Sequence, residues 1–273
     1  MSIRFYIDSC RKDATNLAFL KHRKFDGFIV TMHQSGTHWL KHMLACAIAK
    51  EKGLPPPKDA FAGDMIGGNK DPVKFEGVPL FGHSHTIPSF LITSTLLDKI
   101  IKRPRYVILV RDIRSMLISH YEKFRNYYKC DFSDYLRGNE DIVHKRFASD
   151  IWWCIRFQNA WGRMIEKFPD QCLLLKYENI MADPLSGIKN INSFLGLNLS
   201  DEALIYGVQE STKDKMKAKP LKPQRKMKKK HNREVVRTGT KPREYYFDSD
   251  NLKYFKETCK KFLKYDFGYD YQN

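Results

Sequence analysis

The chain has 273 residues, of which 42% are hydrophobic and 29% charged, and its formal net charge is +17. These values are typical of a soluble globular protein with one α/β core, or two small domains at most. No apolar run approaches the roughly 18 residues of a membrane span, and residues 1–11 lack a signal-peptide segment. The six cysteines are scattered without a C-x-x-C pair, so we expect neither a disulfide framework nor a metal site, and a cytoplasmic location.

The first predicted elements are a strand over 27–32, a tight turn, and a helix over 37–50. The turn reads Ser-Gly-Thr at 35–37, and beyond it apolar residues recur at helical spacing from Trp39 to Ile48. Free N–H groups and the positive end of the helix dipole at such a turn favour an anionic ligand, most often a phosphate. A strand–turn–helix with an ordinary Ser or Thr N-cap is the alternative.

This turn differs from the two common nucleotide-binding loops. A single Gly36 precedes Thr37 without the Lys that G-x-x-x-x-G-K-[ST] requires. No G-x-G-x-x-G is present, so NAD or FAD is not indicated. The segment therefore predicts a phosphorylated ligand other than ATP.

Further along the chain, strands and helices alternate. Short apolar runs predict strands over 105–110 and 172–177, and amphipathic spacing predicts helices over 115–128, 152–165, 184–195 and 250–265. We therefore expect one α/β domain over 1–273, with a central parallel sheet covered by helices on both faces.

Ligands of open parallel sheets lie beyond the carboxyl ends of the strands. Arg111 follows the second predicted strand, Ser119 lies about two helical turns later, and Tyr177 ends the third. An Arg and a hydroxyl near the first phosphate loop suggest a second anionic subsite. A surface ion pair is the alternative for a lone Arg.

A basic segment over 213–233 contains eleven Lys or Arg residues and one acidic residue, Asp214, and so carries ten of the seventeen net charges. Pro220 and Pro223 interrupt it and apolar periodicity is lacking, which predicts a mobile surface loop. It could be a solvated loop or attract an anionic ligand. Because it lacks interleaved aromatic residues for stacking bases, we expect no nucleic-acid partner, and we expect no membrane partner either.

Four segments resemble motifs of the cytosolic-type sulfotransferases that use 3′-phosphoadenosine 5′-phosphosulfate. Thr31–Trp39 resembles the 5′-phosphosulfate loop T-Y-P-K-S-G-T-T-W, and Tyr106–Tyr121 resembles the 3′-phosphate motif with its Arg and Ser eight residues apart. Lys176–Gly196 is similar to the Y-E-D…D-P…F-L-G block, and Val236–Gly239 to the late R-K-G loop. The four matches follow the family order.

The resemblance implies this phosphosulfate as donor, adenosine 3′,5′-bisphosphate as product, no metal, and transfer of a sulfuryl group to a hydroxyl or amine. It implies that the 5′-phosphosulfate is held by Ser35, Gly36, Thr37 and His38. The 3′-phosphate would contact Arg111, Ser119 and the late loop of Arg237, Thr238 and Gly239. The adenine side would be formed by Trp39, Tyr177, Ser211, Thr212 and Met216.

The family's general base is a His in a K-T-H-L-P-like segment, which is similar to Gly82–Pro88 here. His85 falls on the match and would accept the acceptor's proton; His83 is the second candidate, and a surface histidine without a catalytic role is the alternative.

Two departures concern positive charge. The family Lys that stabilises the leaving phosphate is Gln34, and the Lys before the catalytic His is His83. Gln34 donates a hydrogen bond but carries no charge, so His33, His83 or a Lys of the basic segment would have to contribute. In the late loop, the family's Lys and second Gly are Thr238 and Pro242.

These observations favour a sulfotransferase acting on a small-molecule acceptor. The segment over 53–82 should border the acceptor pocket and mixes Pro, Gly and Asp with few apolar residues, which favours a polar acceptor. The alternative is a non-catalytic nucleotide- or polyanion-binding protein on the same fold.

Overall fold

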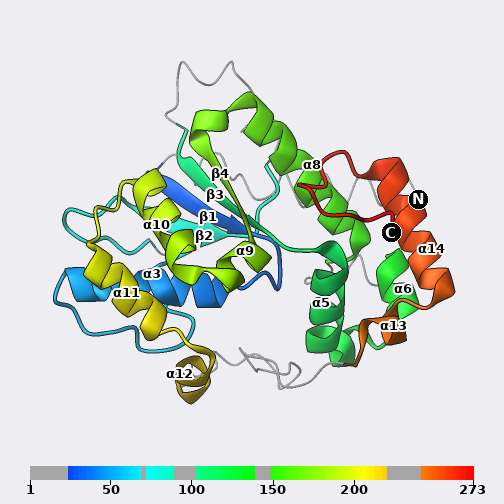
Figure 1. Ribbon diagram of the computed structural model, residues 1–273, viewed down its shortest axis with the longest axis horizontal. Coiled ribbons are helices and arrows are strands. Elements are labelled where there is room, and N and C mark those ends of the chain that lie inside the picture. Colours follow the sequence, from blue (N-terminus) through cyan, green and yellow to red (C-terminus); the bar gives the residue numbers. More distant parts are fainter. Residues whose placement is uncertain (1–23, 69–71, 89–102, 139–148, 220–240) are drawn as a thin grey trace.

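The centre of the protein is a four-stranded parallel sheet. The computed structural model describes residues 24–68, 72–88, 103–138, 149–219 and 241–273. The strands are β1 (Gly27–Thr31), β2 (Phe81–Ser84), β3 (Arg105–Val110) and β4 (Cys172–Lys176), in the order β2-β1-β3-β4 (Figure 1). Ile29 at the middle of β1 is in register with His83 on one side and Val107 on the other.

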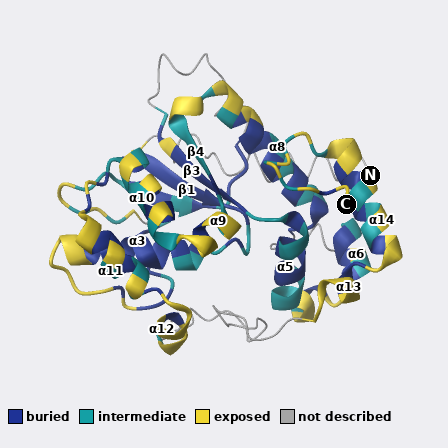
Figure 2. Cartoon of the chain, viewed as in Figure 1, coloured by how far each residue is buried: buried dark blue, intermediate teal, exposed yellow. Residues whose placement is uncertain are grey.

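Both faces of the sheet are covered, as the sequence predicts. Successive side chains of a strand point to opposite faces, so Phe28 and Val30 join one apolar cluster while Ile29 joins the other. The first cluster packs against α5 (Ile113–Tyr128), α6 (Phe132–Arg137), α8 (Ile151–Lys167) and α14 (Ser249–Phe262). The second packs against α3 (Thr37–Glu51), α9 (Tyr177–Ala182), α10 (Pro184–Leu195) and α11 (Asp201–Gln209). Figure 2 shows dark, buried residues along β1 and β3 and on α3 and α8.

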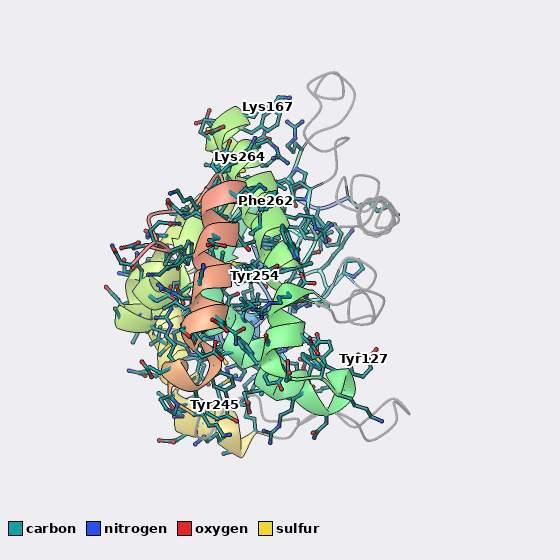
Figure 3. All side chains as sticks on the ribbon, turned by 90° about the vertical axis from the view of Figure 1, so that its right-hand side faces the viewer. Tyr127, Lys167, Tyr245, Tyr254, Phe262 and Lys264 are labelled. Carbon is teal, nitrogen blue, oxygen red and sulfur yellow. The ribbon has the colours of Figure 1, made fainter. Side chains whose placement is uncertain are left out.

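Three short helices complete the described elements: the 3₁₀ turn Pro169–Gln171, α12 (Lys213–Ala218) and α13 (Arg243–Tyr246). On the face formed by α14, aromatic side chains join α14 to α6 and α8: the Arg137 guanidinium lies 4.8 Å from the Tyr254 ring centre, and the Trp152 and Phe262 rings lie 5.0 Å apart. Figure 3 shows Tyr254 and Phe262 along this helix. None of the described helices combines the length and the apolar character needed to cross a membrane.

Most predicted elements are confirmed, but α6, α9 and α11 were not predicted. Tyr177, predicted to end the third strand, instead begins α9. β2 was not predicted because its four residues include Gly82, His83 and Ser84 rather than an apolar run, and it forms by pairing with β1. The basic segment begins with helix α12 instead of a loop, because burial of Met216, which is 2% exposed, anchors that turn. The part of this segment over 220–233 lies outside the described residues.

The strand order places a topological switch point between β1 and β3. The chain leaves β1 through α3 toward one face and pairs next with β2, whereas β3 lies on the other side of β1 and continues into α5 on the opposite face (Figure 1). A crevice opens at such a point because the two connections diverge. The segments after β1 and β3 contain the predicted phosphate loop and Arg111.

Candidate functional site

The loop between β1 and α3 is curled by two left-handed residues. Gln34 has φ 55° and Gly36 has φ 85°. The buried Ser35 hydroxyl donates a 2.6 Å hydrogen bond to the Met32 carbonyl, which closes the curl from within. A Cβ on Gly36 would lie 2.7 Å from the Tyr177 ring, so glycine is required both for the backbone angle and for this close approach.

The two helices that start at the switch point differ in their capping. The N-cap of α3 is Gly36, and no side chain of the described residues caps it. At α5 the N–H groups of Asp112, Ile113 and Ser115 bond to side-chain oxygens at 3.2, 3.2 and 2.8 Å. The alternative of an ordinary Ser or Thr cap on α3 is therefore wrong, and the N–H groups and positive dipole of α3 are left for an anion.

Arg111 lies against this same loop. Its Nη1 donates a 2.6 Å hydrogen bond to the Gln34 carbonyl, and its guanidinium lies 4.6 Å from the centre of the Tyr177 ring. Its Nε is buried and has no hydrogen-bond partner among the described residues. Since Arg has five N–H donors, most of them remain for a ligand beside the first loop. Ser119, 6% exposed, lies about two turns along α5.

His85 is linked to the first residue of α3 through Thr31. Its Nδ1 lies 2.8 Å from the Thr31 carbonyl and 3.1 Å from the Thr31 hydroxyl, which is itself 2.7 Å from the Thr37 hydroxyl. A carbonyl can only accept, so the short contact assigns the proton to Nδ1 and leaves a lone pair on Nε2. This is the tautomer that a general base needs.

The surroundings of His85 favour its neutral form. Burial lowers the pKa of His85 below the usual 6.5, the Thr31 carbonyl opposes this shift, and the positive charges of Lys123 and Lys41 add to it. The His33 ring lies 4.1 Å from the His85 ring, and burial followed by repulsion from His85 holds the pKa of His33 well below its usual value. His85 is therefore able to accept a proton at neutral pH.

The second candidate base occupies a different environment. The Nδ1 of His83 lies 3.1 Å from the Gly67 carbonyl, within the segment that follows α3. His85 contacts the end of β1, where its Nδ1 lies against the carbonyl and hydroxyl of Thr31. The geometry thus favours His85, the residue that the motif match selected.

Trp39 joins α3 to the turn between α11 and α12. Its Nε1 donates a 2.8 Å hydrogen bond to the Ser211 carbonyl, and its ring lies 6.4 Å from that of Tyr177, edge on. The Ser211 hydroxyl is fully buried and lies 2.7 Å from Nδ1 of His42. Ser211 therefore positions Trp39. Thr212 is exposed beside it.

The remaining predicted residues are placed as follows. The His38 ring packs on Phe61 at 4.5 Å, and its buried Nδ1 has no hydrogen-bond partner among the described residues. Met216 is buried in α12. Arg237, Thr238 and Gly239 lie outside the described residues. No group of three metal-binding side chains occurs in the described part of the chain.

The sequence did not indicate Thr31, Lys41 or Lys123 as neighbours of His85, and it suggested His33 only as a source of positive charge. Thr31 and His33 stand inside the matched loop, and each lysine follows a helical histidine by three residues, but nothing in one sequence shows that the two helices converge. These contacts depend on the sheet order.

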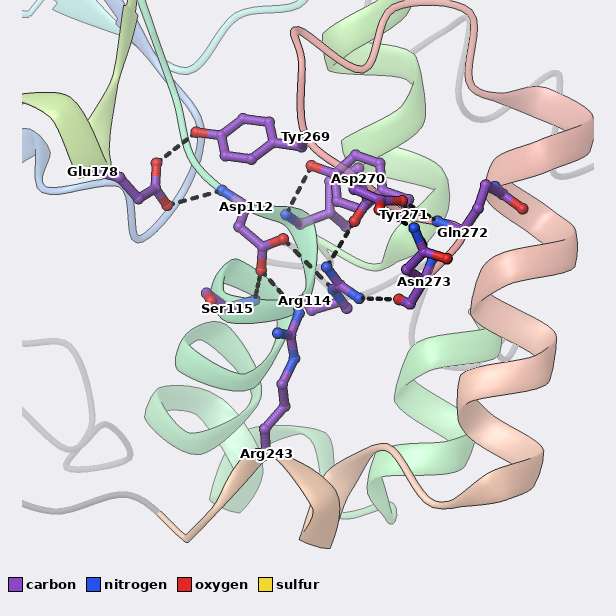
Figure 4. Close-up of polar contacts among 11 residues, drawn as sticks. Asp112, Arg114, Ser115, Glu178, Arg243, Tyr269, Asp270, Tyr271, Gln272 and Asn273 are labelled. Atoms are coloured by element: carbon purple, nitrogen blue, oxygen red, sulfur yellow. Dashed lines mark hydrogen bonds and ion pairs between the residues drawn. The ribbon is translucent and has the colours of Figure 1, made fainter.

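The C-terminal residues brace the start of α5 (Figure 4). Arg114 donates to the Asp270 and Asn273 carbonyls at 2.8 and 3.2 Å. The Asp112 carboxylate accepts from Arg243 at 3.3 Å, and the Tyr269 hydroxyl donates to Glu178 at 2.5 Å. Arg111, one residue before Asp112, is thereby attached to a rigid support.

Comparison with known families and proteins identifies relatives of this chain. The family model described as "Sulfotransferase domain" matches residues 24–266. "Flavonol sulfotransferase-like" of Flaveria bidentis is 23% identical over 68% of this chain and 62% of its own length. "Sulfotransferase 1A1" of Mus musculus is 24% identical over 72% of this chain and 68% of its own. The match thus spans less than two thirds of the plant relative.

Solved structures share the fold. A mouse sulfotransferase, SULT7A1, complexed with PAP superposes with a TM-score of 0.54 at 18% identity, covering 88% of this chain and 85% of its own. Retinol dehydratase in a complex with retinol and PAP superposes with a TM-score of 0.57 at 17% identity, covering 90% and 83%.

Proposed function

The chain belongs to the sulfotransferase family, and from this premise we propose that it transfers the sulfuryl group of 3′-phosphoadenosine 5′-phosphosulfate to a small-molecule acceptor. The observation that carries the proposal is the chain of contacts His85–Thr31–Thr37. These contacts join the His85 imidazole, whose Nε2 carries the lone pair, to the start of α3, where no side chain of the described residues caps the helix. A base beside an anion site is the arrangement that transfer from a phosphosulfate to a hydroxyl requires.

In this proposal, the donor lies across the switch point between β1 and β3. The N–H groups at the start of α3, from the loop Ser35 to His38, bind the 5′-phosphosulfate. Arg111 and Ser119 bind the 3′-phosphate. The buried Nε of Arg111, which has no hydrogen-bond partner among the described residues, supports this assignment. The adenine lies between Trp39 and Tyr177. Met216, Thr212 and the late loop of Arg237, Thr238 and Gly239 complete the site, with Ser211 holding the Trp39 indole.

The proposed reaction is an in-line transfer. The acceptor oxygen bonds to sulfur while His85 takes its proton at Nε2, and the bond from sulfur to the bridging oxygen breaks. The electron pair remains on the 5′-phosphate of adenosine 3′,5′-bisphosphate. Gln34 can offer a hydrogen bond to that oxygen, so its developing charge requires a cation from another residue.

For the acceptor we propose a small polar alcohol or amine. The polar composition of the segment over 53–82 supports this, as does the His38–Phe61 pair, which brings that segment to the start of α3. The plant relatives are named for flavonols, and retinol dehydratase was solved with retinol. We also propose one domain working in the cytoplasm, supported by the five free cysteines among the described residues.

The test compares two nucleotides and one variant by calorimetry. Adenosine 3′,5′-bisphosphate should bind at least tenfold more tightly than AMP, because a charge-assisted contact contributes about 1.5–3 kcal/mol. Arg111→Ala should remove most of that preference, while Arg125→Ala, an exposed position on α5, should retain it. Equal affinity of the wild type for both nucleotides would contradict the donor assignment.

One observation, Gln34 at the position of the family Lys, favours a second candidate function. Since the family Lys is missing, a non-catalytic binder of the same nucleotide is the competing candidate. A screen of alcohols, phenols and amines with the phosphosulfate donor separates the two: transfer to any acceptor supports the enzyme, whereas tight nucleotide binding without transfer to any of them supports the binder.

A further inference from the structure

Helix α11 packs on α3 so closely that glycine is required at the contact. A Cβ on Gly207 would overlap the Met43 carbonyl oxygen and would lie 3.1 Å from the Ala47 Cβ. Only a residue without a side chain allows such a close approach of two backbones. The turn that follows α11 is therefore held at a defined place beside the first turns of α3.

Ser211, in that turn, contacts two side chains of α3. Its carbonyl accepts the hydrogen bond from Trp39 Nε1 at 2.8 Å, and its hydroxyl lies 2.7 Å from Nδ1 of His42. Trp39 and His42 are three residues apart and so share one face of the helix. The carbonyl that orients the Trp39 indole thus belongs to a residue whose own side chain is held by His42.

The contact between His42 and Ser211 is closed to solvent. Both residues are fully buried. The Cys46 Sγ lies 3.6 Å from His42 Nδ1, and burial raises the pKa of this thiol to about 11, so it remains protonated and is a weak hydrogen-bond partner. Loss of the imidazole would therefore deprive the Ser211 hydroxyl of its strong partner in a buried site, which favours displacement of the turn.

The two rings at the proposed adenine site are fixed in different ways. Tyr177 is placed by α9 and by the Arg111 guanidinium, which lies 4.6 Å from its ring centre. Trp39 is half-buried, and its Nε1 is bound to Ser211. Because rotation of the indole changes the surface that it presents to a base, the position of Ser211 determines how well Trp39 stacks. A disturbance at His42 should reach Trp39 and leave Tyr177 in place.

We propose that His42 is a positioning residue for the adenine of the donor, acting through Ser211 on the Trp39 indole. The inference rests on the proposed donor site, in which the adenine lies between Trp39 and Tyr177. His42 takes no part in the bonds that form and break during transfer. It contributes to the affinity for ligands that carry the base, and not to the affinity for the phosphates alone.

Calorimetry with three ligands tests the proposal. His42→Leu should weaken adenosine 3′,5′-bisphosphate and AMP by the same factor, about fivefold or more, because stacking of a base on an aromatic ring contributes on this scale. Ribose 3,5-bisphosphate, which lacks the base, should bind wild type and variant equally. His42→Gln should retain most of the affinity, since its amide can pair with the Ser211 hydroxyl. An unchanged bisphosphate affinity in His42→Leu, or an equal loss with ribose 3,5-bisphosphate, overturns the proposal.

Tyr135→Phe is the matched control. It removes a buried hydrogen bond of the same 2.7 Å length, from the Tyr135 hydroxyl to the Ser149 carbonyl, in the apolar cluster on the other face of the sheet. It should change the affinity for none of the three ligands. Ser211→Ala deletes the hydroxyl and keeps the carbonyl, so it should reproduce the loss for both nucleotides even where His42→Leu does not fold. Wild-type affinities in Ser211→Ala would also overturn the proposal.

A double-mutant cycle identifies the route. Trp39→Phe keeps an aromatic ring but removes the Nε1 donor, so adding His42→Leu to it should cause little further loss, because residues in one chain of contacts are not additive. Additive losses would mean that His42 reaches the ligand by another route and would contradict the proposal. If the wild type binds the bisphosphate and AMP equally, the donor assignment fails, whereas a shared loss for both nucleotides in His42→Leu still supports His42 acting on the adenine. A wild type that binds neither nucleotide contradicts both proposals.

Discussion

At the scale of single residues, the proposed role of His85 as the base depends on one backbone carbonyl. Thr31 is the last residue of β1, and its carbonyl receives the Nδ1 proton of His85 at 2.8 Å. Because that contact selects the tautomer, Nε2 is the atom available to an acceptor. Burial and the nearby lysines then keep the ring neutral.

We predict that His85→Ala lowers turnover by about 10²–10⁴, the usual contribution of general-base catalysis. Adenosine 3′,5′-bisphosphate should bind with nearly wild-type affinity, because His85 approaches the loop only through Thr31. Steady-state kinetics and calorimetry measure the two effects. His83→Ala serves as the comparison, and a larger loss in that variant would transfer the role of base to His83.

The same residue determines the acid limb of the pH profile. A base acts only when unprotonated, so activity falls as the pH drops through its pKa. Since the pKa of His85 is lowered from 6.5, we expect the half-point of the kcat/KM acid limb below pH 6.5.

Gly36 allows a sharp test of the loop. Gly36→Ala places a Cβ 2.7 Å from the Tyr177 ring at φ 85°, so we expect Tyr177 to move and bisphosphate affinity to fall by about tenfold or more. Gly53→Ala is the matched control: it has φ 59°, yet its Cβ would meet nothing within 4 Å. Both variants carry backbone strain of about 1–2 kcal/mol. Similar affinities in the two variants would show that the approach to Tyr177 is unimportant.

At the scale of elements, the two helices of the switch point have different tasks. α3 begins after its N-cap, Gly36, and no side chain of the described residues caps its first N–H groups. α5 has its first N–H groups occupied by Asp112, Glu178 and Tyr271, and the C-terminal residues tie it down. The first arrangement favours an anion at the helix end, whereas the second holds Arg111 and Ser119 in position.

One hydrogen bond of this brace can be removed by deleting a single atom. Tyr271→Phe deletes the hydroxyl that accepts the Ile113 N–H at 3.2 Å, and both residues are buried. An unsatisfied buried donor costs about 1–3 kcal/mol, so urea unfolding should show a loss of this size. Bisphosphate affinity should decline as well, since Ile113 follows Arg111 by two residues. Tyr245→Phe, at a side chain that is 60% exposed, should change neither quantity.

At the scale of the whole molecule, burial of histidines links folding to pH. Burial lowers the pKa of His42 to about 4 and that of His120 to about 3, from 6.5. Below pH 6.5 the unfolded chain therefore binds protons at these two histidines, whereas the folded chain binds them only at about pH 4 or lower. The contribution of these two histidines to the free energy of unfolding should thus be constant above pH 6.5 and decrease as the pH falls toward 4.

We predict this decrease in urea titrations between pH 6.5 and 4, at up to about 1.4 kcal/mol per pH unit for each histidine. His42→Gln should flatten the slope, because the amide can still pair with the Ser211 hydroxyl but does not titrate. An equal slope in wild type and variant would mean that His42 keeps its ordinary pKa in the folded protein.

Much of this molecule is predictable from the sequence alone. The apolar runs at 27–32, 105–110 and 172–177 predict three of the four strands, because parallel strands buried on both faces must be continuously apolar. The turn at Ser35–Thr37 and the Arg111–Ser119 spacing predict the proposed anion sites, because such sites are local in the chain. The short polar strand β2 carried no such signal, and pairing with β1 alone makes it a strand.

The tertiary structure decided the contacts between these local pieces. The order β2-β1-β3-β4 brings the Arg111 guanidinium to the Gln34 carbonyl and His85 to Thr31, although 77 and 54 residues separate the partners. It likewise brings Lys123 on α5 within electrostatic reach of His85. The sequence determines which segments become strands, helices and tight turns, since backbone propensity and periodicity are local. Which side chains share a site depends on strand order, because neighbours across a sheet need no proximity along the chain.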